Sequence, residues 1–238
     1  MMSNLDPGLW DGIKGVLFDK DGTLLDFTKT WMPAYRAGAL FAAGEDPDKA
    51  TRMLSATGLD EGSESFAAGS LLASGTTDKI VAAWEPFGTC LPADELVSRL
   101  DEVFTDVTEW SSAGFPGVGE ALSGLKERGL SVGLATNDCE KSARVSMSCL
   151  GLTPSFDFIC GYDSGHGAKP GGGMVEAYGS AVGLPPAAIM VVGDNPCDME
   201  MARNAGAGCA VGVLSGNGAR KDLEALADIV INGVGDLL

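Results

Sequence analysis

Two aspartates stand where an apolar run near the start of the chain ends. The stretch GVLFDKDGTLLDF begins at Gly15, and its apolar residues stop at Asp19 and Asp21, which a glycine and a threonine follow. Two carboxylates placed so close together repel each other, and the repulsion grows as water is excluded. A positively charged partner is therefore needed to hold both of them at the end of a buried strand.

Polar residues follow other apolar runs further along the chain. They are Thr136 and Asn137 after LSVGLATN, Lys169 after SFDFICG, and Asp194 and Asp198 after AIMVVGDN. Ligands of open parallel sheets bind at the carboxyl ends of the strands. We therefore expect these five side chains to gather at one edge of a sheet, together with the first two aspartates.

The gathered residues have the chemistry of a site for a metal and a phosphate. Mg²⁺ prefers oxygen ligands from carboxylates, waters and a substrate phosphate. The expected ligands of Mg²⁺ are Asp19, Asp21, Asp194 and Asp198. The three remaining residues offer a hydroxyl, an amide and an ammonium group, which are the donors that a bound phosphate needs.

The chain positions these residues by alternating short apolar runs with helical patterns. From about residue 112, the runs LSVGLATN, SFDFICG, AIMVVGDN, GCAVGVL and ADIVING predict parallel strands, and GVLFD is expected to join their sheet. Between them, helices are predicted at 117–128, 139–150, 172–183, 197–206 and 218–226. The pattern therefore predicts an α/β fold, with helices on both faces of a doubly wound parallel sheet.

The segment 29–111 differs from the rest of the chain. It is rich in Ala, Leu, Met and Trp, it contains no convincing strand, and it breaks at GEDPD, TGLDEG, ASGTT and CLPAD. This composition is typical of a helical insert. We expect an α/β core built from residues 1–28 and 112–238, and a helical cap domain from residues 29–111.

Charge and cysteine usage narrow the function. The 238 residues carry a formal net charge of −17, which argues against binding to nucleic acid or to anionic membranes, because both need a basic surface. The six cysteines form no CxxC pair, so neither a zinc site nor a disulfide framework is indicated. The N-terminal stretch lacks the features of a signal peptide. A cytoplasmic protein that binds a small phosphorylated metabolite is expected.

The quoted motifs also resemble those of a known family. FDKDGTL, ATN, AKPGGGM and VVGDNPCDM occur in the order and spacing of the haloacid dehalogenase superfamily of phosphatases, and the chain looks similar to its phosphoglycolate-phosphatase-like branch. The resemblance implies a Rossmann-like core with a helical cap inserted after the first strand. It also implies Mg²⁺-dependent hydrolysis of a small phosphomonoester, such as phosphoglycolate, through an aspartyl-phosphate intermediate.

The resemblance assigns a role to each matching residue. Asp19 is expected to be the nucleophile and Asp21 the acid and base. Thr136 and Lys169 match the second and third motifs and would bind the phosphoryl group, with Asn137 beside them. Asp194 matches the acid of the last motif that binds the metal, and Asp198 is a further carboxylate of that motif.

Simpler explanations exist for single residues. An isolated DxDG stretch is also typical of an Asx turn, and Asp198 stands in the first turn of a predicted helix, where the dipole favours an acid. Lys169 alone could be a surface lysine. His166, the only histidine, is not given a catalytic role, because Asp21 already supplies the acid and base.

Other functions remain open within and beyond the superfamily. A haloacid dehalogenase would not need the carboxyl of Asp21. A phosphonate hydrolase would need a Schiff-base lysine from the cap, for which Lys29, Lys49 and Lys79 are candidates. A sugar-phosphate mutase would return the phosphoryl group to its product. A phospho-accepting signalling module is the alternative that is not an enzyme, although such receivers are shorter and have their acidic pair in a different order.

Overall fold

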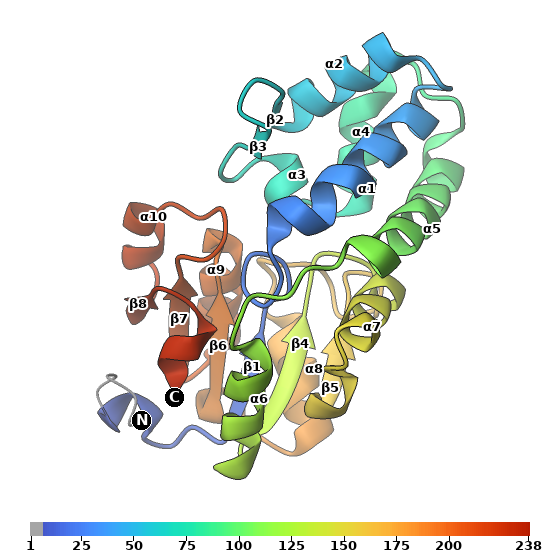
Figure 1. Cartoon of the computed structure of the whole chain (residues 1–238). Coiled ribbons are helices and arrows are strands. Elements are labelled where there is room, and N and C mark those ends of the chain that lie inside the picture. The colour runs from blue at the N-terminus through green and yellow to red at the C-terminus, as the bar shows by residue number, and fades with distance from the viewer. Residues whose placement is uncertain (1–6) are drawn as a thin grey trace.

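The protein has two lobes, an α/β core and a helical lobe that stands on one end of it (Figure 1). The computed structural model describes residues 7–238. Residues 1–6, which the sequence assigned to the core, lie outside the described part of the chain. Within residues 7–238, no helix combines the length and the apolar character that a membrane crossing requires.

The core is built on a sheet of six parallel strands in the order β5-β4-β1-β6-β7-β8. Its strands are β1 (Gly15–Phe18), β4 (Ser131–Ala135), β5 (Phe158–Cys160), β6 (Ile189–Gly193), β7 (Cys209–Val213) and β8 (Ile229–Ile231). The first strand lies in the middle of the sheet, between β4 and β6. The doubly wound parallel sheet predicted from the sequence is confirmed, and each apolar run named above supplies one of its strands.

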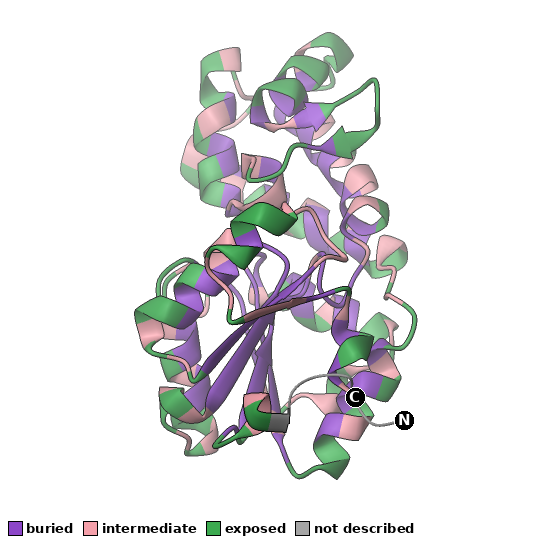
Figure 2. Cartoon of the chain, turned by 90° about the vertical axis from the view of Figure 1, so that its left-hand side faces the viewer, coloured by how far each residue is buried: buried purple, intermediate pink, exposed green. Residues whose placement is uncertain are grey.

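Helices cover both faces of this sheet, so the strands are buried on both sides (Figure 2). Val16 and Phe18 pack with α6, α7 and the C-terminal 3₁₀ turn Val234–Leu237, whereas Leu17 packs with α8 and α9 on the opposite face. This alternation follows from the two-residue period of a strand. The core helices are α6 (Val118–Glu127), α7 (Glu140–Cys149), α8 (Gly173–Val182), α9 (Pro196–Ala205) and α10 (Arg220–Glu224).

The second lobe corresponds to the predicted cap. Its helices are α1 (Phe27–Ala42), α2 (Pro47–Thr57), α3 (Leu71–Ser74), α4 (Thr77–Trp84) and α5 (Ala93–Ser111). They enclose their own apolar cluster, separate from the two clusters of the core. The helix α1 begins two residues before the predicted boundary because the Asp26 side chain accepts a hydrogen bond from the Lys29 amide and caps it.

The expectation that the cap contains no strand is wrong. Leu59–Asp60 (β2) pairs with Ser65–Phe66 (β3) in a small antiparallel hairpin. Leu59 and Phe66 are buried in the apolar cluster of the cap. Strands of two residues are too short to show an alternating pattern, and the first of them lies within TGLDEG, a stretch that by itself indicates a break between helices.

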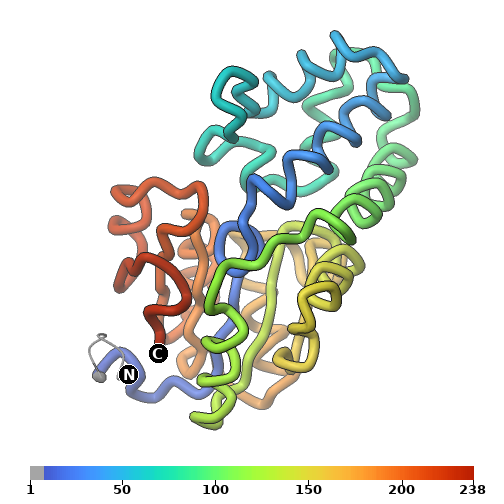
Figure 3. The backbone as a smooth tube through the Cα atoms, in the orientation of Figure 1, coloured from blue at the N-terminus to red at the C-terminus, as the bar shows by residue number. Residues whose placement is uncertain are grey.

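Two connections join the lobes and run side by side (Figure 3). The Asp26 amide donates to the Ala113 carbonyl at 2.7 Å, and the Phe115 amide donates to the Leu24 carbonyl at 3.0 Å. The cap therefore leaves and rejoins the core at one place. This place adjoins the end of β1, where Asp19 and Asp21 stand.

Candidate active site

Three aspartates from two strand ends meet at the top edge of the sheet. Asp19 follows β1, Asp194 follows β6, and Asp198 lies in the first turn of α9. All three are buried, and one carboxylate oxygen from each lies within 4.8 Å of those of the other two. The structure therefore brings together three of the four predicted metal ligands.

Lys169 lies among these carboxylates. Its Nζ atom is 2.6 Å from Asp19 Oδ1 and 2.7 Å from Asp198 Oδ1, and the side chain is buried. Burial alone would lower the pKa of Lys169, but Asp19 and Asp198 raise it above its ordinary value. The ammonium group therefore remains charged. The simpler explanation, a lysine on the protein surface, does not hold for Lys169.

Close backbone approach positions Asp194. Asp194 Oδ2 accepts a hydrogen bond from the Asn217 amide at 2.8 Å. Gly22 has a φ of 86°, and a Cβ atom at this position would lie 2.5 Å from Asp194 Oδ2. Only glycine both adopts this positive φ without strain and leaves the space that the Asp194 carboxylate occupies. The glycine after the first two aspartates thus leaves room for the acid of the last motif.

The N-terminus of α9 positions Asp198. Its Oδ2 atom accepts a hydrogen bond from the Asn195 amide at 3.0 Å, while the Asn195 side chain accepts one from the Cys197 amide. This reciprocal capping satisfies orphan amides of the helix. Asp198 therefore has both the structural role of a capping acid and a place in the carboxylate cluster, through its other oxygen.

Thr136 and Asn137 extend the site from the end of β4 (Ser131–Ala135). The Thr136 side chain is buried, and its hydroxyl accepts a hydrogen bond from the Asp138 amide at 3.0 Å. Asn137 Nδ2 donates to the Ser74 carbonyl of the cap at 2.9 Å, and its Oδ1 atom accepts from the Lys169 amide at 2.9 Å. Its amide group thus connects the cap, the second motif and the third motif.

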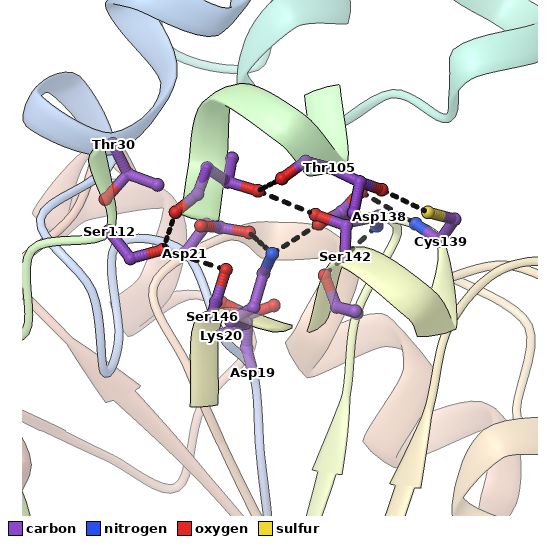
Figure 4. A network of polar contacts seen from close by, with 12 residues as sticks. Asp19, Lys20, Asp21, Thr30, Thr105, Ser112, Asp138, Cys139, Ser142 and Ser146 are labelled. Carbon is purple, nitrogen blue, oxygen red and sulfur yellow. Dashed lines mark hydrogen bonds and ion pairs between the residues drawn. The ribbon is translucent and has the colours of Figure 1, made fainter. Parts of the chain in front are cut away.

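Asp21 is held apart from the cluster of three by a buried ion pair (Figure 4). Lys20 is fully buried, and its Nζ atom lies 3.3 Å from Asp21 Oδ2 and forms a hydrogen bond with Asp138 Oδ2. The Trp31 ring of the cap covers this ammonium group at 5.3 Å. Asp21, the fourth residue predicted to bind the metal, is not among the three carboxylates that approach one another.

Burial shifts the pKa of these acids upward. It raises the pKa of Asp21 to about 6, against the opposing effects of the Lys20 charge and the Trp31 indole. It also raises the pKa of Asp198 to about 6, and that of Asp194 well above its ordinary value, with Asp19 adding to both shifts. A carboxyl with a pKa near neutrality can both release and accept a proton.

Three residues of the site, Lys20, Asp138 and Trp31, are not among those predicted from the sequence. Lys20 stands between the two aspartates of the first motif, and a lysine in this position, at the end of an apolar run, was the available signal. Asp138 directly follows ATN. Their pairing joins residues 118 positions apart, so only the fold could reveal it. His166 is exposed and does not line the cavity.

A cavity lies between the carboxylates and the cap. Its volume is about 50 Å³, and its floor consists of the residues described above. Among the described residues, few buried side-chain atoms lack a hydrogen-bond partner, and four of these belong to residues that line the cavity: Asp19 Oδ2, Asp21 Oδ1, Trp31 Nε1 and Asn195 Nδ2. Unpaired buried polar atoms are costly, so their concentration here indicates a ligand site.

The donor set fits a divalent metal ion. Three buried carboxylates offer oxygen ligands within reach of one ion. The pKa of Asp194 is raised because burial and its acidic neighbours penalise its charge, a penalty that a cation would offset. Hard cations such as Mg²⁺ take oxygen ligands of this kind.

Comparisons with known proteins agree with this geometry. The family model of the haloacid dehalogenase-like hydrolases matches residues 13–206. A phosphoglycolate phosphatase of Caulobacter vibrioides is 35% identical over 147 residues, which is 61% of this chain and 61% of that protein. A phosphoglycolate phosphatase of Shigella boydii is 28% identical over 96% of this chain and 92% of its own length.

Solved structures show the same fold. A hydrolase from Pseudomonas syringae is 25% identical and superimposes with a TM-score of 0.69 over 94% of this chain and 95% of its own. CbbY from Rhodobacter sphaeroides in complex with phosphate is 20% identical, with a TM-score of 0.67 over 95% and 97% of the two chains. With its motifs brought to one sheet edge and a family match over most of its length, the chain belongs to the haloacid dehalogenase-like hydrolases.

Proposed function

We propose that the protein is a Mg²⁺-dependent phosphatase that hydrolyses a small phosphomonoester through an aspartyl-phosphate intermediate. The proposal rests on the surroundings of the two carboxylate oxygens of Asp19. One of its carboxylate oxygens is bound by Lys169 at 2.6 Å, and the other is buried in the cavity without a partner. An oriented carboxylate with one free oxygen suits nucleophilic attack on phosphorus.

The residues around Asp19 suit the charge of a transferring phosphoryl group. Negative charge spreads over its oxygens in the transition state, so catalysis depends on positioning and neutralisation. Lys169 supplies a fixed positive charge, and the Thr136 hydroxyl supplies a donor. Asn137 orients Lys169 through the backbone of that residue. When bound by Asp19, Asp194 and Asp198, Mg²⁺ would add further positive charge at the phosphoryl oxygens.

Asp21 suits the role of acid and base. Lys20 anchors its Oδ2 atom, while Oδ1 remains buried and unpartnered beside the cavity. In the first step, Asp21 would protonate the oxygen of the leaving group. In the second step, it would take a proton from the water that hydrolyses the aspartyl phosphate. A fixed carboxyl with one free oxygen can perform both transfers without moving between them.

The substrate class comes from the family and the cavity. The cavity has a volume of about 50 Å³, which favours a substrate of metabolite size over a macromolecule. Phosphoglycolate, for which the relatives from Caulobacter and Shigella are named, is the reference compound for any substrate panel. A cytoplasmic location fits a metabolite of this kind.

Phosphonate hydrolysis is disfavoured by the positions of the cap lysines. Lys29 is 73% exposed and pairs with Asp26, and Lys49 donates to the Gly88 carbonyl. Neither these residues nor Lys79 line the cavity. A Schiff-base lysine would have to reach the substrate, and among the described residues of the cap none does.

Phosphate release from p-nitrophenyl phosphate with Mg²⁺ tests the proposal. The Asp19→Asn variant should lose turnover by at least about three orders of magnitude, because the nucleophile is removed. The control is Asp48→Asn, which makes the same change on the exposed surface of α2 and should behave as the parent does. An active Asp19→Asn variant would show that the nucleophile is another residue.

A further inference from the structure

The part of the cavity that faces the cap carries no charge. Its cap lining consists mainly of the apolar and aromatic side chains Phe27, Trp31, Tyr35, Leu72, Ile80 and Phe104, and it also includes Ala73, Gly75 and the hydroxyl residues Ser74 and Thr77. The aromatic rings among them contact one another, with Trp31 stacked on Tyr35 at 4.9 Å. Any group that a substrate carries beyond its phosphate must therefore lie against a wall that has no formal charge and in which aromatic and aliphatic side chains predominate.

The cations of the cap point elsewhere. The segment 29–111 contains six basic residues, which are Lys29, Arg36, Lys49, Arg52, Lys79 and Arg99, and none lines the cavity. Arg36, for example, pairs with Glu61 and Glu64 at the exposed hairpin. A negative group on the substrate would meet no countercharge from the cap.

The two cations near the cavity are already paired. Lys169 contacts Asp19 and Asp198, and Lys20 contacts Asp21 and Asp138. Burying an additional, unpaired carboxylate beside these acids costs free energy through both desolvation and repulsion. The site is therefore unsuited to a leaving group with a negative charge.

Among the polar side chains of this wall, only the Trp31 indole forms no hydrogen bond within the described part of the protein, whereas the Ser74 hydroxyl donates to the Ser70 carbonyl and the Thr77 hydroxyl donates to Asp101. Trp31 is 4% exposed, and its Nε1 atom has no hydrogen-bond partner. The indole N–H lies close enough to the carboxyl of Asp21 to lower the pKa of that group, without forming a hydrogen bond with it, and Asp21 stands where the leaving group would separate. The Tyr35 hydroxyl, by contrast, is already used, because it donates to the Leu72 carbonyl at 2.7 Å.

We infer that the preferred substrate is a small phosphomonoester whose leaving group is uncharged and carries a hydrogen-bond acceptor near the ester oxygen, which the Trp31 indole binds. This inference rests on the phosphatase activity proposed above. It makes Trp31 a residue that determines specificity, in addition to its contact with Lys20. It also distinguishes this site from one built to bind a carboxylate.

Matched substrates test the charge of the leaving group. Phosphoglycolate, phosphoglycolamide, propyl phosphate and phosphoethanolamine have similar sizes and carry an anionic, a neutral polar, a neutral apolar and a cationic group. We expect kcat/KM to be highest for phosphoglycolamide, and at least about tenfold higher than for phosphoglycolate. A higher kcat/KM for phosphoglycolate or for phosphoethanolamine would overturn the inference.

A single substitution tests the donor. Trp31→Phe removes the N–H group and retains a ring over Lys20, so the preference for phosphoglycolamide over propyl phosphate should fall by about tenfold. Trp84→Phe is the matched control, because the Trp84 indole donates to the Met53 carbonyl inside the cap and lies outside the cavity. An unchanged preference in Trp31→Phe would show that the indole is not the donor.

The same assays separate this inference from the function on which it rests. Hydrolysis of p-nitrophenyl phosphate, lost in Asp19→Asn, reports on the phosphatase activity alone. If that activity is present and phosphoglycolate is the best substrate, the proposed function stands and the inference fails. If no phosphomonoester is hydrolysed, both fail together.

Discussion

Asp19 and Asp21 are separated by one residue, yet their carboxylates have different partners. Lys169 binds the first and Lys20 binds the second. Because each carboxylate contacts its own ammonium group, the repulsion between Asp19 and Asp21 is offset. The two acids can therefore have different roles in the proposed reaction. Lys20 also contacts Asp138. At the scale of single residues, the site is thus a set of buried acids that two lysines neutralise in part.

Lys169 tests the neutralising role most simply. In Lys169→Ala, the positive charge beside Asp19 and Asp198 is lost, so the transition state loses a fixed stabilising group. We expect turnover to fall by at least about two orders of magnitude. Steady-state hydrolysis of p-nitrophenyl phosphate measures this. A variant within a few fold of the parent would remove Lys169 from the catalytic residues.

Lys20 tests the cost of breaking a buried ion pair. Lys20→Met leaves two acids without a countercharge, and we expect the free energy of unfolding to fall by about 3 kcal/mol. Adding Asp138→Asn removes one of these charges and should restore part of the loss. Urea unfolding of the two single variants and the double variant measures the coupling. Strictly additive effects would contradict a direct interaction between Lys20 and Asp138.

At the scale of elements, the cap contacts the core through polar side chains. Thr108 of α5 and Ser112, which directly follows that helix, form hydrogen bonds with Ser142 and Ser146 of α7, as Figure 4 shows in part. Nearby, Asp101 of α5 accepts hydrogen bonds from Thr77 of the cap and from the Tyr162 hydroxyl of the core, at 2.6 and 2.7 Å. Contacts of this kind fix the cap above the carboxylates.

The contact made by Asp101 predicts a dependence of stability on pH. Burial raises the pKa of Asp101 to about 6, above the value near 4 that is usual in an unfolded chain. The stability that this group contributes is therefore fully present below pH ~4 and is lost as the pH rises through ~6. The Asp101→Asn variant has no carboxyl to lose its proton as the pH rises. The free energy of unfolding of the variant, relative to that of the parent, should therefore rise by at most about 3 kcal/mol between pH ~4 and pH ~6.

Urea unfolding of both proteins between pH 4 and pH 7.5 measures this difference. Asp106→Asn, on the exposed side of the same helix, is the control and should show no such trend. If the stability difference between Asp101→Asn and the parent did not change with pH, the carboxyl of Asp101 would have an ordinary pKa in the folded protein.

At the scale of the whole molecule, the sequence predicted the sheet, the helical lobe and the residues of the four motifs. Strands such as β6 (Ile189–Gly193) are continuous apolar runs followed by polar residues. This pattern involves only neighbouring residues, so it can be recognised in the sequence alone. The roles of Lys20 and Trp31 could not be predicted, because they depend on contacts between the lobes. The hairpin at Leu59 and Phe66 was missed because its strands are too short to show a period.

Metal dependence is a property of the assembled site. We expect activity to disappear after chelation and to return with Mg²⁺, since three buried carboxylates otherwise remain poorly neutralised. Excess Ca²⁺ should suppress it, because the larger ion accepts longer and less regular coordination and would misplace Asp19. Phosphate release with each metal measures both effects. Full activity after exhaustive chelation would contradict a metal role for Asp19, Asp194 and Asp198.

The central claim is that phosphate passes to Asp19 and that Asp21 handles the protons. Rapid mixing of Asp21→Asn with p-nitrophenyl phosphate tests both parts, because nitrophenolate leaves with little need of a proton, whereas water must still be activated. We predict a burst of about one equivalent of nitrophenol, followed by a stall, with a phosphoryl group on Asp19 detected by mass spectrometry. Steady turnover near the parent rate without a burst, and without phosphoprotein, would contradict the mechanism.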